Sequence, residues 1–225
     1  MYNLFDMKKR NPYKAHFFNF KKILYDIFKW SGWPLFFWFR IKKIYATAKA
    51  KKKIRRGGAL VISNHILFSD PMVLHSTFWY RRLHFVVMKE LFDNKFRAFF
   101  FRQSGCIPVD REKPSLKTLR EIVQRLEGGN MVAIFPEGHI SWGTNPMSPF
   151  KSGAVLMAYQ ANVPIIPVYR EIRENAWKRQ RIVMGEPIYL KETFGENMGM
   201  DKIEEATKYL FEKELELKEI YQRGK

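Results

Sequence analysis

The spacing of apolar and polar positions divides the chain near Gly57 and Gly58. After this point, short apolar runs of the length of buried strands recur. These runs are Ala59–Ser63, Phe85–Met88, Met131–Phe135, Ile165–Tyr169 and Arg181–Met184. Segments with helical spacing separate them, namely Pro71–Trp79, Phe92–Gln103, Ser115–Glu127 and Lys151–Gln160. Strands that alternate with helices predict an α/β fold with a mixed, largely parallel sheet covered by helices.

The rest of the composition agrees with one such domain. Asp201–Arg223 has the polar pattern of a surface helix, with Asp201 as its N-cap. A length of 225 residues with 46% hydrophobic residues allows a sizeable core and excludes collagen and mostly disordered chains. The single cysteine, Cys106, excludes an intrachain disulfide framework and cannot alone form a thiolate metal site.

Residues 1–57 form a different kind of segment, rich in basic and aromatic side chains. The chain has a net charge of +18, and residues 1–58 hold 16 Lys and Arg against only Asp6 and Asp26. Residues 17–45 contain 12 of the 36 aromatic residues. Cations that meet anionic head groups, together with rings at the boundary, are typical of a membrane interface.

This N-terminal segment is too interrupted to cross a bilayer. Its longest charge-free run, Trp30–Phe39, has ten residues and contains Gly32 and Pro34, whereas a span needs roughly 20. Basic residues follow the run where a signal peptide would have small ones. We therefore expect two short amphipathic helices that lie in the interface as a membrane-binding element. A helical hairpin packed on the protein's own core is the alternative.

The first candidate chemistry follows the first predicted strand, in the segment NHILFSD. A carboxylate such as Asp70 can fix the tautomer of the His65 imidazole and stabilise its charged form, while the other ring nitrogen takes a proton. On one continuous helix these side chains would lie about 140° apart, so they meet only if His65 is on a turn. Asp70-Pro71 favours a helix that starts there, with Asp70 as its cap. In the alternative interpretation Asp70 is only a cap and His65 a surface loop residue.

Two further segments end apolar runs in polar residues. GCIPVDR ends in Arg111, whose planar guanidinium suits bidentate phosphate binding. FPEGH contains Glu137 and Gly138, a carboxylate beside backbone that can approach a ligand closely. Open α/β sheets bind ligands beyond the carboxyl ends of their strands, where these residues and His65 would gather. Taken singly, each is more often an ordinary surface residue.

In four ordered blocks the chain resembles the glycerolipid acyltransferases typified by 1-acyl-glycerol-3-phosphate acyltransferase. The blocks are NHILFSD for the NHx4D pattern, GCIPVDR, FPEGH for the FPEG(T/S) pattern, and VPIIP at residues 163–167. The resemblance covers roughly Gly58–Pro187. It implies an acyltransferase domain over residues 58–225, behind the membrane-interface helices of residues 1–57.

The resemblance also implies the reaction. His65 would be the general base that removes the proton of an acceptor hydroxyl, and Asp70 would orient it. A fatty acyl group would pass from acyl-CoA or acyl carrier protein to a lysophospholipid, above all 1-acyl-sn-glycerol-3-phosphate, to give phosphatidic acid. The thioester is a co-substrate, and we expect no cofactor and no metal. The implied enzyme is membrane-associated, peripheral or monotopic, on the cytoplasmic face, with membrane phospholipids as partners.

Binding roles follow from the same resemblance. Arg111 would bind the phosphate of the acceptor, and Glu137 and Gly138 would shape the acceptor site. Lys89 and Lys151 match basic positions of the family and are further phosphate candidates. Ordinary surface lysines are the alternative for both.

One departure from the family concerns the acceptor. FPEG is usually followed by Thr or Ser, then Arg, then Ser, but here His139, Ile140 and Ser141 follow it. The missing arginine removes a positive charge expected near the acceptor, so another lysolipid or polar-lipid acceptor is the alternative. His139 either donates a hydrogen bond there or packs, and we predict packing.

Two functions of other classes compete with acyl transfer. A nucleic-acid-binding protein would use the basic and aromatic residues of the N-terminal segment. The remainder of the chain holds 24 basic and 20 acidic residues, however, and the His65 segment has no role in such a protein. We therefore expect no nucleic-acid partner. An inactive membrane-binding scaffold is the second competitor, and the presence of both His65 and Asp70 argues against it.

Overall fold

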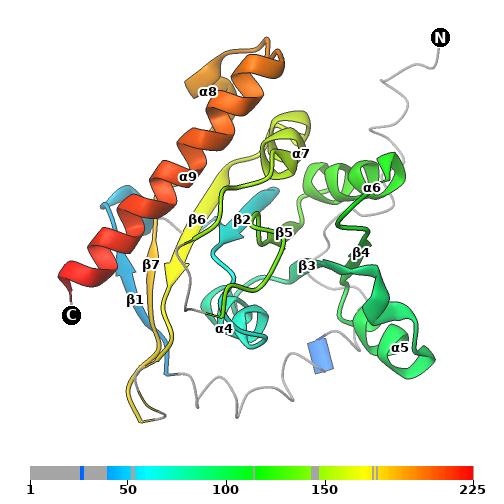
Figure 1. Cartoon of the computed structure of the whole chain (residues 1–225), viewed down its shortest axis with the longest axis horizontal. Helices are drawn as coiled ribbons and strands as arrows, with labels where there is room; N and C mark the ends of the chain where they lie inside the picture. The colour runs from blue at the N-terminus through cyan, green and yellow to red at the C-terminus, as the bar shows by residue number, and fades with distance from the viewer. Residues whose placement is uncertain are drawn as a thin grey trace.

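A seven-stranded sheet forms the centre of the part of the chain that the structure describes (Figure 1). The structure is a computed structural model, and it describes residues 26–27, 40–51, 54–113, 115–142, 147–173, 175 and 177–224. The strands are β1 (Lys42–Tyr45), β2 (Ala59–Ser63), β3 (Leu83–Met88), β4 (Ile107–Val109), β5 (Met131–Ile134), β6 (Ile165–Arg170) and β7 (Arg181–Met184). Their order in space is β1-β7-β6-β2-β5-β3-β4.

Most strand pairs in this sheet are parallel. The central strand β2 pairs in parallel with β5 and β6, and β3 pairs in parallel with β5 and β4. β1 and β7 pair in parallel, whereas β6 and β7 pair antiparallel. The carboxyl ends of β6, β2, β5, β3 and β4 therefore lie at one side of the sheet, here called the carboxyl edge. This arrangement confirms the predicted α/β fold with a mixed, largely parallel sheet.

Helices cover both faces of the sheet. Among the described residues the helices are α4 (Asp70–Thr77), α5 (Lys95–Gln103), α6 (Leu116–Glu127), α7 (Gly153–Ala161), α8 (Leu190–Phe194) and α9 (Met200–Arg223), with short 3₁₀ turns η3 (Lys49–Lys51) and η4 (Lys89–Phe92). α4 packs on one face, and α6, α7, α8 and α9 share a core with the other. In Figure 1, α9 runs diagonally across β6 and β7, and α5 stands at the lower right.

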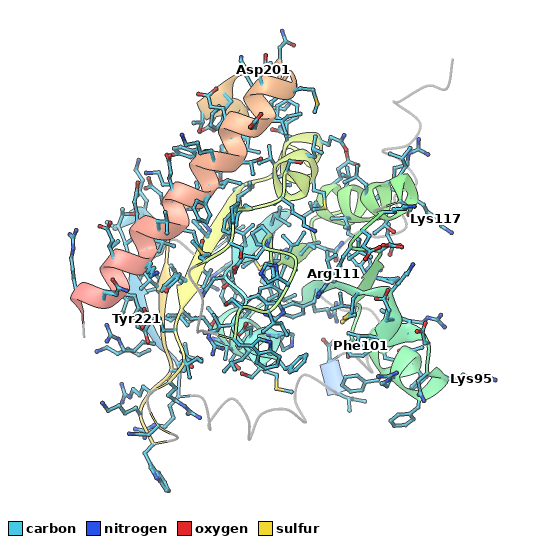
Figure 2. All side chains as sticks on the ribbon, in the orientation of Figure 1. Lys95, Phe101, Arg111, Lys117, Asp201 and Tyr221 are labelled. Carbon is cyan, nitrogen blue, oxygen red and sulfur yellow. The ribbon has the colours of Figure 1, made fainter. Side chains whose placement is uncertain are left out.

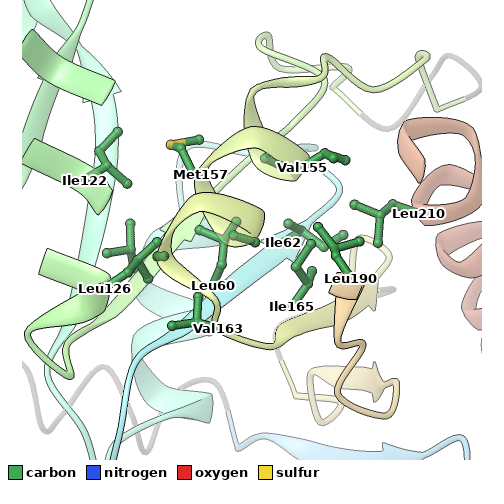
Figure 3. Close-up of a cluster of buried hydrophobic side chains, with 14 of the residues drawn as sticks. Leu60, Ile62, Ile122, Leu126, Val155, Met157, Val163, Ile165, Leu190 and Leu210 are labelled. Carbon is green, nitrogen blue, oxygen red and sulfur yellow. The ribbon is translucent and has the colours of Figure 1, made fainter. Parts of the chain in front are cut away.

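The alternation of side chains along β2 produces these two layers. Leu60 and Ile62 face the α6–α9 side, whereas Ala59 and Val61 face α4, as the twofold repeat of a strand requires. Figure 3 shows the larger cluster, which includes Leu60, Ile62, Ile122, Leu126, Val155, Met157, Val163, Ile165, Leu190 and Leu210. All five residues of β2 are buried, so the loop that follows β2 starts from a rigid position.

Helix α6 illustrates how local sequence sets these elements. Leu119, Ile122, Val123 and Leu126 recur at the spacing of one helical face and pack into the larger core. Ser115 is the N-cap, and its hydroxyl oxygen accepts the backbone N–H of Thr118 at 3.1 Å. The predicted helix over residues 115–127 is confirmed.

Strands β1 and β4 are not predicted by the sequence pattern. β1 lies within the basic segment that the sequence analysis assigned to the N-terminal element, and it pairs with β7 from Lys42 opposite Arg181 to Tyr45 opposite Met184. It is a four-residue edge strand with two lysines, so its apolar pattern is too short to be recognised as a strand in the sequence. Residues 42–45 therefore belong to the sheet, and the division of the chain at residue 57 stays a prediction.

The predictions for the two ends of the chain have different outcomes. α9 begins at Met200 with Gly199 as N-cap, so the predicted cap role of Asp201 is wrong; Asp201 lies in the first turn. The predicted pair of membrane-interface helices falls largely on residues outside the described ranges and stays a prediction. Of the helices within the described ranges, none has the length and apolar content that crossing a bilayer requires.

Candidate active site

The loop after β2 turns Asp70 back toward His65. Helix α4 begins at Asp70, one residue earlier than predicted, and its N-cap Ser69 makes no side-chain cap bond. Oδ2 of Asp70 instead accepts the backbone N–H groups of Ile66, at 2.7 Å, and Leu67, at 2.9 Å. The predicted capping role of Asp70 is therefore wrong. These loop contacts aim its carboxylate at the residues before the helix, where it can meet the imidazole.

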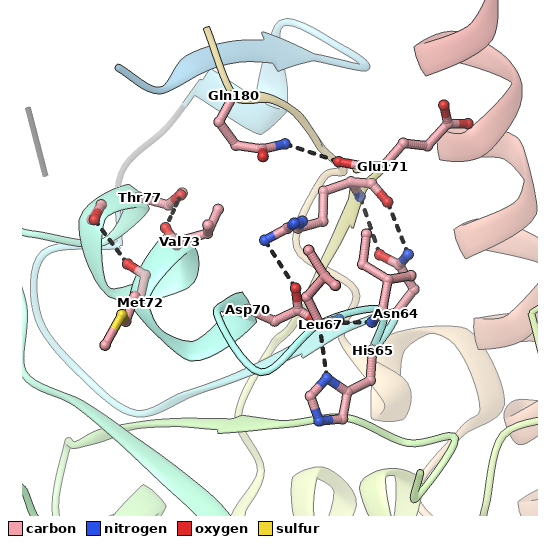
Figure 4. Close-up of polar contacts among 12 residues, drawn as sticks. Asn64, His65, Leu67, Asp70, Met72, Val73, Thr77, Glu171 and Gln180 are labelled. Atoms are coloured by element: carbon pink, nitrogen blue, oxygen red, sulfur yellow. Dashed lines mark hydrogen bonds and ion pairs between the residues drawn. The ribbon is translucent and has the colours of Figure 1, made fainter. Parts of the chain in front are cut away.

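His65 and Asp70 form a buried pair (Figure 4). Nδ1 of His65 lies 2.8 Å from Oδ2 of Asp70, with side-chain exposures of 9% and 0%. The ring of Phe135 stacks on the imidazole at a centroid distance of 4.0 Å and an interplanar angle of 14°. Among the described residues Nε2 of His65 has no hydrogen-bond partner. A carboxylate on one nitrogen and an unengaged second nitrogen form the arrangement of a general base.

Arg170 completes the surroundings of Asp70, and the sequence analysis missed it. Nη1 of Arg170 lies 2.9 Å from Oδ1 of Asp70, and both side chains are buried. Asn64 fixes the backbone of Arg170: its side-chain N–H₂ donates to the carbonyl of Arg170 at 2.9 Å, and its side-chain oxygen accepts the N–H at 3.1 Å. Burial lowers the pKa of the Arg170 guanidinium, and the charge of Asp70 opposes this. The sequence offered one signal for this residue: Arg170 is the last residue of β6, whose other positions carry no charge.

Glu137 holds the backbone of His65. Its Oε1 accepts the backbone N–H of His65 at 2.8 Å, and its Oε2 accepts the N–H of Ser148 at 2.9 Å. The side chain is buried, with 2% exposure. From the same loop after β5, Ser141 donates its N–H and its hydroxyl to the carbonyl of His65 at 2.8 and 3.1 Å. Both oxygens of Glu137 thus bond to backbone, a role that the sequence analysis did not predict.

Gly138 and Lys151 lie side by side next to this loop. Gly138 has a φ of +76°, and a Cβ there would come within 3.1 Å of Cε and Nζ of Lys151. Lys151 is exposed. His139 is also exposed; its Nδ1 lies 3.1 Å from the carbonyl oxygen of Glu137, and its Nε2 lies 3.1 Å from the hydroxyl of Ser148. The predicted packing of His139 is therefore wrong.

Lys89 follows β3 and Arg111 follows β4, so both lie at the carboxyl edge. Nζ of Lys89 lies 2.5 Å from Oδ2 of Asp110, whose Oδ1 accepts the backbone N–H groups of residues 112–113 at 3.0 Å each. The hydrogen bond from Lys89 holds the pKa of Asp110 at about 2, and Asp110 in turn raises the pKa of Lys89. Arg111 is exposed, and Figure 2 shows it between α5 and the centre of the sheet. Within the described residues no hydrogen bond or ion pair joins Arg111 or Lys89 to His65.

The sequence-predicted residues therefore fall into two groups, those around His65 and the basic pair Lys89 and Arg111. His65, Asp70 and Glu137 form one bonded cluster, with Gly138 next to it in the chain. Lys89 is bound to Asp110, so it is a weaker phosphate candidate than Arg111. In the described ranges no three His, Cys, Asp or Glu side chains are placed to share a metal ion.

A third buried acid, besides Asp70 and Glu137, lies close to the His65 loop. Glu214 of α9 is fully buried. Burial raises the pKa of Glu214 to about 8; the backbone N–H of Asn64 lowers it and the charge of Glu137 raises it further. The sequence analysis placed this acid on a polar surface helix and missed its burial, because periodicity alone does not show which polar positions face the sheet.

We expect Glu214→Gln to change how stability depends on pH. The folded state holds the pKa at about 8 against an ordinary value of 4.5, so folding favours the protonated acid. Stability from this group is therefore present at low pH and is lost as pH rises from about 4.5 to about 8. Glutamine does not ionise, so the Tm of the variant minus that of the wild type should increase over this range in thermal melts.

The matched control for this prediction is Glu212→Gln, which changes an exposed acid of the same helix. Its Tm should differ from that of the wild type by the same small amount at every pH. A Tm difference for Glu214→Gln that stays constant from about pH 5 to about pH 8.5 would contradict the buried, protonated state of Glu214.

The known proteins to which this chain is similar are acyltransferases. The family model "Acyltransferase" matches residues 46–171. The 1-acyl-sn-glycerol-3-phosphate acyltransferase of Bacillus subtilis (strain 168) is 27% identical over 137 residues, which are 59% of this chain and 67% of that protein. The protein of the same name from Haemophilus influenzae (strain ATCC 51907 / DSM 11121 / KW20 / Rd) is 31% identical over 165 residues, 69% of this chain and 66% of that protein. The matched stretches thus span about two thirds of these relatives.

A solved structure shares the fold. The crystal structure of the 1-acyl-sn-glycerophosphate acyltransferase from Thermotoga maritima superposes with a TM-score of 0.61 at 20% identity, covering 89% of this chain and 81% of that one. The residues matched by the family model include His65, Asp70, Glu137 and Arg170 and exceed half of the 225 residues. On this evidence the chain belongs to the Acyltransferase family.

Proposed function

We propose that this protein transfers a fatty acyl group from a thioester to the free hydroxyl of 1-acyl-sn-glycerol-3-phosphate, giving phosphatidic acid in phospholipid biosynthesis. The observation that carries this proposal is the buried contact of 2.8 Å between His65 and Asp70, with Nε2 of the imidazole unengaged. Relatives that bear the name of this activity support the choice of acceptor.

The catalytic residues in this proposal are His65 and Asp70. Nε2 of His65 takes the proton of the acceptor hydroxyl, and the oxygen attacks the thioester carbonyl. The tetrahedral intermediate then collapses: its C–S bond breaks, and the thiolate leaves and takes the proton from the imidazolium. Asp70 accepts a hydrogen bond from Nδ1–H throughout and stabilises the imidazolium while it exists. Acyl group and proton balance, and the chain itself is never acylated.

The contacts around His65 support this role because they fix the ring before substrate arrives. Asp70 holds Nδ1, Phe135 covers one face of the ring, and Glu137 and Ser141 bind the backbone N–H and carbonyl of His65. A base that is already in position needs little reorganisation in the transition state, and positioning supplies a large share of a rate enhancement.

The acceptor phosphate is proposed to bind at Arg111. Its guanidinium is exposed in a turn that Asp110 stabilises through two backbone N–H groups, and a planar fork binds phosphate through two oxygens. Lys151, beside Gly138, is the second basic side chain of the site. Lys89 contributes less directly, because its ammonium group is bound to Asp110.

The donor and the location complete the proposal. Acyl-CoA and acyl carrier protein are both acidic, and the basic surplus of residues 1–58 attracts either of them. The same segment, with its aromatic residues, is proposed to hold the protein on membrane phospholipids at the cytoplasmic face, where lysolipid and product reside. No cofactor is required, because the thioester supplies the activated acyl group.

One assay tests this function. Purified full-length protein in detergent is supplied with acyl-CoA and a panel of acceptors: 1-acyl-sn-glycerol-3-phosphate, other lysophospholipids and monoacylglycerol. Thiol release and phosphatidic acid by mass spectrometry are expected with the first acceptor. Release only with another lysolipid would overturn the acceptor assignment, and would point to the His139-Ile140 departure as its cause. No release with any acceptor and either donor would overturn the proposed function.

Removing the guanidinium of Arg111 should affect binding of the phosphate-bearing acceptor. A charge-assisted hydrogen bond contributes about 1.5–3 kcal/mol, so Arg111→Gln is expected to raise KM for 1-acyl-sn-glycerol-3-phosphate by about tenfold or more with a smaller change in kcat. Arg120→Gln, an exposed arginine of α6, is the matched control. An unchanged KM, or an equal rise for monoacylglycerol, would contradict phosphate binding by Arg111.

A further inference from the structure

Helix α5 exposes aromatic side chains that the core does not use. The rings of Phe96 and Phe99 are 81% and 54% exposed, whereas Ala98 on the opposite side of the helix is buried. Phe96 and Phe99 are three positions apart, so they lie about 60° from each other around the helix axis. They form one apolar stripe rather than two scattered contacts with water.

Basic side chains accompany this stripe. α5 has the sequence KFRAFFFRQ, in which Lys95, Arg97 and Arg102 are exposed and no acid occurs. The nearest acids in sequence, Glu90 and Asp93, lie before the helix. Figure 2 shows the labelled Lys95 extending away from the molecule at the end of α5. Rings on one face with cations at its borders are the pattern of a helix that lies in a lipid interface.

The position of α5 relates it to the active site. α5 follows β3, and the His65 loop follows β2; both strands pair in parallel with β5, so both connections leave the carboxyl edge. Two more exposed rings rim the site at this edge. Phe68 of the His65 loop is 75% exposed and contacts Trp142, 51% exposed, at a centroid distance of 5.1 Å. The connection that contains α5, the His65 loop and the loop that carries Trp142 therefore all leave the same edge of the sheet.

We propose that α5 is a membrane-docking helix that seats the carboxyl edge on an anionic phospholipid bilayer, separately from residues 1–39. Charge complementarity favours an anionic bilayer as the partner of α5. Lys95, Arg97 and Arg102 face its anionic head groups, while Phe96 and Phe99 enter the boundary of the acyl chains. The docking deepens the proposed function, since it brings the acceptor hydroxyl of a lysolipid to His65 without removing the lipid from the bilayer.

The experiment measures binding of the full-length protein to vesicles of phosphatidylcholine with phosphatidylglycerol. Phe96→Ser/Phe99→Ser is expected to lower the partition coefficient by about tenfold or more. Lys95→Gln/Arg97→Gln/Arg102→Gln should do the same at low salt and should weaken the dependence on salt. The matched control is Trp79→Ser/Met200→Ser, which removes two apolar side chains that are 56% and 80% exposed away from the carboxyl edge; it should bind within about twofold of the wild type.

A label on α5 gives an independent readout. The chain has one cysteine, so Phe99→Cys in a Cys106→Ala background carries an environment-sensitive dye at one position. Its emission should shift to the blue when anionic vesicles are added. Vesicle-bound protein whose dye keeps its aqueous emission would overturn the proposal, as would a serine pair that binds like the wild type. A wild-type dimer that the serine pair dissociates without loss of vesicle binding would assign the stripe to a second copy of the chain instead.

The same variants separate this proposal from the proposed function. Thiol release with a short-chain, monomeric lysolipid does not require a bilayer, so Phe96→Ser/Phe99→Ser should retain the wild-type rate there and lose it on vesicle-borne acceptor. A wild type without acyltransferase activity would overturn the function, and the vesicle measurements would still decide the docking of α5. Equal losses on monomeric and vesicle-borne acceptor would overturn docking and place α5 in the substrate site.

Discussion

His65→Ala is expected to lower kcat/KM for acyl transfer by about 10²- to 10⁴-fold, the usual contribution of a positioned general base. In the proposed mechanism the imidazole takes the proton of the acceptor hydroxyl, and within the described residues no other histidine contacts Asp70. The loss should appear in kcat, because the acceptor and the donor bind through other groups. Thiol release at saturating substrate is the measurement.

The fold should survive this substitution. Without the imidazole, Asp70 keeps its bonds to the N–H groups of Ile66 and Leu67 and its ion pair with Arg170. The far-ultraviolet circular dichroism spectrum and vesicle binding of the variant should match those of the wild type. His75→Ala, which changes a histidine of α4 outside the bonded cluster, should retain activity within about twofold. Full activity of His65→Ala would rule out the proposed mechanism.

Arg170→Met is expected to destabilise the protein by about 3–5 kcal/mol, the usual cost of removing one partner of a buried ion pair. The guanidinium lies 2.9 Å from the Asp70 carboxylate, and neither side chain is more than 2% exposed. Methionine has a similar volume, so the loss reports an uncompensated buried charge rather than a cavity. Urea unfolding measures it, and Arg179→Met, at an exposed position, should change the free energy of unfolding by less than about 0.5 kcal/mol.

A double variant distinguishes charge pairing from simple packing. In Asp70→Asn/Arg170→Met neither member of the buried pair carries a charge, so much of the lost stability should return. Acyl transfer should stay low, because a neutral amide does not stabilise the imidazolium. A double variant as unstable as Arg170→Met alone would contradict the pairing, and a double variant with wild-type activity would remove Asp70 from the mechanism.

The structure indicates a role for Glu137 of the FPEG segment that differs from the one implied by the resemblance. The resemblance assigned Glu137 to the acceptor site, but both of its oxygens bond to backbone N–H groups, one of them that of His65. Glu137 thereby ties the loop after β5 to the loop after β2. We infer that it affects acyl transfer by positioning the base, while Gly138 and Lys151 line the approach.

The sequence predicted those parts of this site that local patterns specify. NHILFSD named His65 and Asp70, and the Asp-Pro step located the start of α4 to within one residue. It predicted the contact of Asp70 with His65, but not the bonds of Asp70 to the loop N–H groups or its ion pair with Arg170. In the sequence, helix capping and loop bonding compete for the same carboxylate. That competition is decided by the path of the loop, which the packing of Phe135 and the bonds of Glu137 fix.

What the amino-acid sequence alone determined is the set of strands with a continuous apolar pattern, the helices between them, and the contact of His65 with Asp70, the pair to which we assign the chemistry. Only the tertiary structure revealed the edge strand β1, the burial of Glu214 and the pairing of Arg170 with Asp70. The physical reason is the same in each case. Periodicity reports which side of an element is apolar, whereas the partner of a single polar group depends on segments that are distant in the chain, such as Asp70 and Arg170, and are brought together only by the sheet.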